Sequence, residues 1–241
     1  MRTLVVPAAI MFLAVAPVFA QPAREHLDAM RHLRLGQDSL RLEQFDMAES
    51  EFQAAIRLEP SLEMAHYGLG QVCMATRRYP AAVRAYLACR DAFVVSNRQR
   101  ALGDLEAQQA LDDQIRAIEA QETAVAVGGG SGQKFELDRA IADLRALQRR
   151  SKSTSGIPAW ISFALGSAYF RSDEIPDAER EYLAALQADP KLGEAHNNLA
   201  VVYLQTGRYD KAAEEVSAAE KSGFRVNPQL KSDIRKAQGR S

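Results

Sequence analysis

The chain has 241 residues, enough for one large domain or two small ones. Apolar residues make up 47% of it, which supports a packed core and argues against wholesale disorder. With 30 basic and 31 acidic residues the formal net charge is -1, so no basic surplus is present to neutralise phosphates. We therefore expect no nucleic-acid partner.

Residues 1–20 differ from the rest of the chain. Arg2 precedes an uncharged apolar run from Leu4 to Phe19, and the small residue Ala20 follows. A positive start, an apolar middle and a small residue before the cut are typical of a secretory signal peptide. We expect cleavage after Ala20, a mature chain that starts at Gln21, and a periplasmic or secreted protein. The alternative is an uncleaved membrane anchor, the one route by which we expect membrane association, although two prolines interrupt this short run.

One pattern of small and aromatic residues then occurs four times. It starts with a Leu-Gly or Leu-Ala pair, and the separations between successive pairs are 34, 96 and 34 residues. The first residues of the pairs are Leu35, Leu69, Leu165 and Leu199. An alanine follows thirteen residues after each: Ala48, Ala82, Ala178 and Ala212. Four residues further on stand Phe52, Tyr86, Tyr182 and Val216.

This pattern resembles the tetratricopeptide repeat (TPR). The resemblance implies an all-α superhelical solenoid of antiparallel helix pairs, with two repeats in residues 24–95 and two in residues 157–224. In such a repeat the small residues let two helices approach closely, and the aromatic residue fills the wedge between units. We therefore expect Ala178→Leu to destabilise the protein by overpacking, and a substitution at nearby Glu181 to have little effect.

Residues 96–152 lack the repeat pattern and form an insertion between the two repeat pairs. Apolar residues keep helical spacing on both sides of the glycine-rich segment at residues 128–132, which predicts two helices joined by a flexible turn. The alternative is that Leu102-Gly103 marks a decayed repeat. After the fourth repeat, Asn227-Pro228 predicts a helix over residues 228–238 that caps the exposed end of the solenoid.

No pattern in the sequence indicates catalysis. Signatures of serine hydrolases, zinc proteases, phosphate loops and dinucleotide sites are missing, so we expect a non-enzyme with no cofactor and no small-molecule substrate. Three of the four histidines, His32, His66 and His196, occupy one repeat slot and are too far apart to share a metal ion. Cys73 and Cys89 occupy packing slots, so we expect buried free thiols and no disulfide.

The resemblance also implies a binding surface, because the first helices of TPR units line a concave groove that commonly binds peptides. The residues expected there are mostly apolar, aromatic or amide-bearing. The candidates are Met64, Tyr67, Gln71, Met74, Trp160, Phe163, Phe170, Asn197, Asn198 and Leu204. Some family members capture C-terminal carboxylates, but Leu33, Gln37 and Gly68 stand at the slots that would need polar or basic residues. Alternatively, the inserted helices fold back and cover this surface.

The sequence thus favours a scaffold or adaptor that binds a partner peptide or protein through its concave TPR surface in the cell envelope. The alternative is a structural subunit of an envelope assembly that self-associates or docks through the inserted helices.

Overall fold

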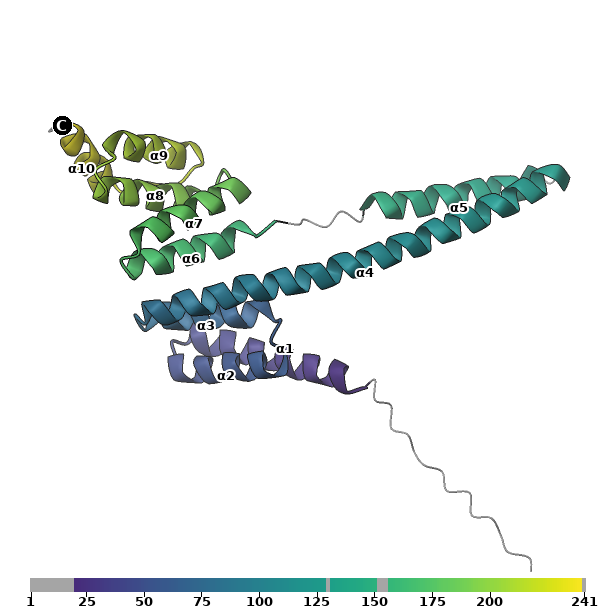
Figure 1. Cartoon of the computed structure of the whole chain (residues 1–241), viewed down its shortest axis with the longest axis horizontal. Coiled ribbons are helices and arrows are strands. Elements are labelled where there is room, and N and C mark those ends of the chain that lie inside the picture. Colours follow the sequence, from purple (N-terminus) through teal and green to yellow (C-terminus); the bar gives the residue numbers. More distant parts are fainter. Residues whose placement is uncertain (1–19, 129–130, 151–155, 240–241) are drawn as a thin grey trace, which may run out of the picture.

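The computed structural model describes residues 20–128, 131–150 and 156–239, so the proposed signal segment up to Phe19 lies outside the described residues. All ten elements in this part of the chain are helices, which confirms the all-α fold (Figure 1). Four antiparallel pairs stack in chain order. They are α1 (Ala20–Arg41) with α2 (Phe45–Leu58), α3 (Glu63–Ala75) with α4 (Tyr79–Gly128), α6 (Ala159–Arg171) with α7 (Ile175–Ala188), and α8 (Gly193–Gln205) with α9 (Tyr209–Lys221). Helix α5 (Ser131–Arg150) packs on α4, and α10 (Pro228–Gln238) packs on α9.

Small residues allow the close helix crossings. The four alanines of the repeat pattern, Ala48, Ala82, Ala178 and Ala212, are all fully buried. Phe52 of α2 lies against Gly36 of its own repeat and Gly68 of the next, and a Cβ atom on Gly36 would lie 2.7 Å from the Phe52 ring. A side chain at these positions would displace the ring that joins the two repeats.

The turn within each helix pair contains one residue in the left-handed region. Glu43, Arg77, Asp173 and Gly207 hold this position, with φ angles of 56°, 58°, 63° and 73°. Their spacing in the chain equals that of the repeats. Only the fourth repeat uses glycine, the residue that adopts this conformation without steric strain.

An arginine–glutamate pair joins the repeats within each half of the chain. Arg78 donates to the Glu49 carboxylate at 2.6 Å, and Arg208 donates to that of Glu179 at 2.6 Å. Both arginines are held by a threonine hydroxyl two residues earlier, and both carboxylates come from the preceding repeat. The hydrogen bonds from Arg208 lower the pKa of Glu179. The two halves therefore use the same contact between their repeats.

The junction between the halves is made differently. Helix α4 packs against α6. One hydrophobic core runs from the second repeat through the fourth, although the insertion separates these repeats in the chain. Here Arg90 of α4 donates to the Glu181 carboxylate of α7 at 3.2 Å. Glu181 is only 5% exposed, which contradicts the premise that it is a surface residue, so we expect its substitution to affect stability. In two other repeats the glutamate at this slot contacts a histidine of its own repeat, but the third repeat has Ser162 in place of that histidine. The Glu181 carboxylate therefore contacts the preceding repeat instead.

Residues 79–128 form one continuous helix of 50 residues, about 75 Å long at 1.5 Å per residue. The expected separate first helix of the insertion is therefore the extension of the second repeat's own helix. Because α4 runs unbroken through Leu102-Gly103, this pair is not part of a decayed repeat. Helix α5 returns along the extension, with Ile115 and Ile141 buried between them.

The extension of α4 and α5 together form an arm. Figure 1 shows the arm pointing away from the four helix pairs. It does not fold back over the first helices of the repeats, so the covering alternative is wrong.

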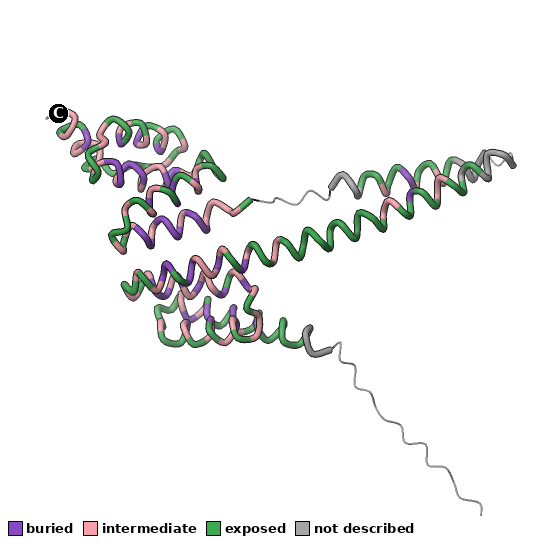
Figure 2. The backbone as a smooth tube through the Cα atoms, in the orientation of Figure 1, coloured by how far each residue is buried: buried purple, intermediate pink, exposed green. Residues whose placement is uncertain are grey.

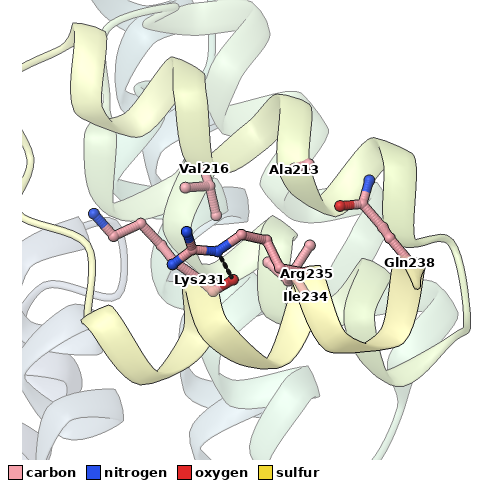
Figure 3. Close-up of a pocket in the computed structure, with 6 residues that line it drawn as sticks. All are labelled: Ala213, Val216, Lys231, Ile234, Arg235 and Gln238. Atoms are coloured by element: carbon pink, nitrogen blue, oxygen red, sulfur yellow. Dashed lines mark hydrogen bonds between the residues drawn. The ribbon is translucent and has the colours of Figure 1, made fainter. Parts of the chain in front are cut away.

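The C-terminal helix α10 covers the last repeat. The Asn227 side chain accepts a hydrogen bond from the Gln229 backbone at 2.8 Å and caps the helix start. Ile234, 2% exposed, packs into the core. A cavity of about 260 Å³ remains between α9 and α10 (Figure 3). Its lining residues are Ala213, Val216, Lys231, Ile234, Arg235 and Gln238.

Candidate functional site

A hollow of about 420 Å³ opens on the side of the repeats formed by their first helices, which we call the inner face. Residues of three repeats line it: Met74 of α3, Ser167, Phe170 and Arg171 of α6, Tyr182 of α7, and Asn198 and Val201 of α8. Met74, Phe170 and Val201 contribute its apolar lining. One end is polar, so the hollow can hold an apolar side chain beside a hydrogen-bonding group.

The polar end is a chain of hydrogen bonds between helices. Asn198 donates to the Tyr182 hydroxyl at 3.3 Å, and this hydroxyl donates to Ser167 at 3.4 Å. Ser167 in turn donates to the Phe163 carbonyl at 3.0 Å. Burial raises the pKa of Tyr182, so its hydroxyl stays protonated and can donate throughout the physiological pH range.

Two donor groups remain for a ligand. The Asn198 amide has two N–H groups, and the bond to Tyr182 uses one of them. Arg171 is exposed at the rim, and within the described residues its guanidinium makes no ion pair or hydrogen bond. Both groups can donate to a carbonyl or carboxylate oxygen in the hollow.

The candidates that the sequence named all lie on first helices, but in different surroundings. Met74, Phe170 and Asn198 line the hollow. Tyr67 and Trp160 pack edge to face, with ring centroids 4.9 Å apart, and join α3 to α6 across the junction. The Trp160 ring is thus a packing group of the junction. The remaining candidates lie around these groups: Phe163 against the Tyr182 ring, Asn197 donating to Asn198, Met64 at the surface, and Gln71 and Leu204 half-buried.

Sequence reasoning missed Ser167, Arg171 and Tyr182. The repeat frame could have found Ser167, because it occupies the same repeat slot as the predicted Gln71. Arg171 follows the slot of Phe170 directly. The pattern places Tyr182 among the packing residues, and only the stacked structure shows that its hydroxyl reaches the hollow.

The histidines and cysteines of the described residues lie in repeat contacts or in the core. Among the described residues no three His, Cys, Asp or Glu side chains are placed to hold a metal ion. His32 and His196 each contact a glutamate of their own repeat at 2.6 Å. Cys73 and Cys89 are free and buried, and burial raises the pKa of Cys89 to about 12, which keeps this thiol unreactive. None of the described helices combines the length and apolar character needed to cross a membrane.

Comparisons with known proteins identify one family and several similar solved structures. The tetratricopeptide-repeat family model matches residues 33–93 and 163–224, just over half of the chain. Similar solved structures include a thermophilic TPR protein of Thermus thermophilus, 21% identical, with 87% of this chain and 98% of that chain covered and a TM-score of 0.37. They also include YrrB, a TPR protein with an unusual peptide-binding site, at 15% identity, coverage of 91% and 98%, and a TM-score of 0.31. MamA from Desulfovibrio magneticus is 16% identical, with coverage of 81% and 95% and a TM-score of 0.32. No curated protein is significantly similar to the chain.

Proposed function

Because the chain belongs to the tetratricopeptide-repeat family, we propose that it is a non-catalytic scaffold or adaptor that binds a peptide or protein partner on its inner face. Proteins of this family generally mediate protein–protein interactions. The hollow between α3, α6 and α8 supports this proposal most directly, because it is lined by three successive repeats and offers both apolar side chains and unused donors.

The geometry suits an extended peptide segment. An apolar side chain of the partner would occupy the space between Met74, Phe170 and Val201. A backbone carbonyl or side-chain oxygen beside it would accept hydrogen bonds from Asn198 and Arg171. Anchoring one side chain in a well-packed pocket with polar contacts at its rim is how many interfaces concentrate their binding energy.

The proposal is tested by selecting displayed random peptides on the purified chain and measuring the affinity of enriched peptides by calorimetry. We expect Arg171→Ala and Asn198→Ala each to weaken binding by about tenfold or more. The matched control is Arg225→Ala, which removes another exposed arginine without an ion pair in the described structure. Arg171→Ala and Arg225→Ala should both melt like the wild type. Enriched peptides that bind all three variants equally would place the binding site elsewhere.

We further propose that the protein acts in the cell envelope, after export and removal of residues 1–20. The support is the charge and hydropathy pattern of these residues. Mass spectrometry of the envelope fraction should find a chain that begins at Gln21. A mature pool that retains Met1 would instead favour the membrane anchor.

The projecting arm favours a second role as well, in assembly. A long helical extension with exposed leucines suits a structural subunit that associates with other chains. Deleting residues 97–151 should abolish such an association, as measured by light scattering coupled to size-exclusion chromatography. An unchanged oligomeric state after this deletion would argue against the second role.

A further inference from the structure

The middle of α4 is a bare single helix. All residues from 98 to 110 are exposed, between the part of α4 packed in the repeats and the part paired with α5 (Figure 2). This stretch contains Gly103 and the exposed Leu102 and Leu105, at 56% and 52% exposure. An interior glycine lowers the stability of an exposed helix, because glycine loses more conformational freedom on folding than other residues do. A covering partner would stabilise the stretch.

An apolar stripe leads from the bare stretch back to the repeats. Ala81, Ala88, Val95 and Leu102 are spaced by seven residues, so they lie along one side of α4 in the manner of one heptad position. Val95 is 48% exposed. Ala81 and Ala88 border a hollow of about 550 Å³ between α2 and α4. The stripe is therefore continuous from the bare helix to an open groove beside it.

The stripe is complementary to itself when reversed. Ala88 and Leu102 lie seven residues before and after Val95, so in an antiparallel pair centred there each small residue faces a large one. Arg84 and Glu106 lie eleven residues before and after Val95, so each arginine faces a glutamate of the other copy. Both are exposed, and neither forms an ion pair within the described part of the chain.

From this we infer that two copies of the chain associate through the α4 stripe, as an antiparallel helix pair with its twofold axis at Val95. Closed twofold symmetry uses the same patch on both copies, as this self-complementary stripe requires. Exposed ion pairs contribute little stability, so Val95 and Leu102 supply most of it and the charges select the antiparallel orientation. None of the residues lining the inner-face hollow belongs to the stripe. The dimer specifies the second role proposed above, and it does not depend on the proposed peptide binding. Val95 lies outside residues 97–151, so Val95→Asp separates this contact from any association made by the rest of the arm.

The oligomeric state of the purified chain tests this inference. Sedimentation equilibrium should show a dimer in reversible equilibrium with monomer. Val95→Asp places two carboxylates opposite each other at the axis and should abolish the dimer. Phe135→Asp is the matched control, because Phe135 is also exposed, at 66%, but lies on α5 away from the stripe. A monomer at all concentrations, or a dimer insensitive to Val95→Asp, overturns the inference.

Charge reversal tests the register of the pair. Arg84→Glu and Glu106→Arg should each weaken the dimer, and the double variant should restore it, because the ion pairs form again with opposite polarity. Independently, Val95→Cys should give a disulfide between copies under mild oxidation, whereas Phe135→Cys should not. Failure of both the rescue and the cross-link would exclude the antiparallel arrangement at Val95.

Discussion

Replacing Arg90 with methionine should weaken the junction between the two halves of the chain while keeping most of the side-chain volume. The substitution removes the guanidinium that donates to Glu181 at 3.2 Å. The Glu181 side chain is 6% exposed, whereas that of Arg90 is 32% exposed. Breaking a fully buried pair costs about 3–5 kcal/mol. Here Arg180 remains 3.8 Å from the carboxylate and water reaches the Arg90 position, so we expect a loss of about 1–3 kcal/mol.

The assay is urea unfolding followed by circular dichroism, for both single variants and the double variant. Glu181→Leu leaves Arg90, which can reach water, so it should cost less than Arg90→Met. The double variant should be close to the wild type, because replacing both partners of a buried pair with apolar residues is often neutral. Arg116→Met is the control, since the Arg116–Asp113 pair on the arm is more than 70% exposed on both sides and should contribute almost nothing.

Additive effects of the two single substitutions would refute the proposed role of this ion pair. The same conclusion would follow if Arg90→Met were no more harmful than Arg116→Met. Either result would mean that the ion pair forms without contributing to the contact between the second and third repeats.

Three further predictions concern the repeats themselves. Ala178→Leu should lower the free energy of unfolding by about 1–3 kcal/mol because its site is fully buried, whereas Leu183→Ala, at a position 45% exposed on the same helix, should change it little in the same urea assay. Glu179 has a lowered pKa through its hydrogen bonds from Arg208, so its contribution is complete above the usual carboxyl pKa of about 4.3 and is lost as the pH falls through its folded-state value. The melting-temperature difference between wild type and Glu179→Gln should therefore shrink on acidification, and a constant difference would contradict this origin. Gly207→Ala should cost about 1–2 kcal/mol in thermal unfolding, since φ is 73° there, and an unchanged melting temperature would mean that the turn relaxes.

Part of the candidate site was accessible from the sequence, because the repeat frame specifies which side of a first helix each residue occupies. The frame alone places Met74, Phe170 and Asn198 on one face. It does not specify which residues of neighbouring repeats meet. Trp160 packs against Tyr67, and the Tyr182 hydroxyl enters the hollow. Both arrangements depend on how far the repeats rotate as they stack.

The sequence by itself determined the helix pairs, their turns and the capping helix, since these depend on local spacing and on residues such as Asn227-Pro228. The length of α4 is also a local property, because no glycine or proline interrupts it between Ala81 and Leu102 and the helix therefore continues beyond the repeat and becomes the arm. Only the tertiary structure decided which residues of different repeats meet. The neighbours of Glu181 in the sequence predict a surface residue. It is buried because the stacking of the repeats brings Arg90 against it, although the two residues are 91 positions apart. Local sequence patterns specify the helix pairs. Which residues of different repeats come into contact depends on how the repeats stack.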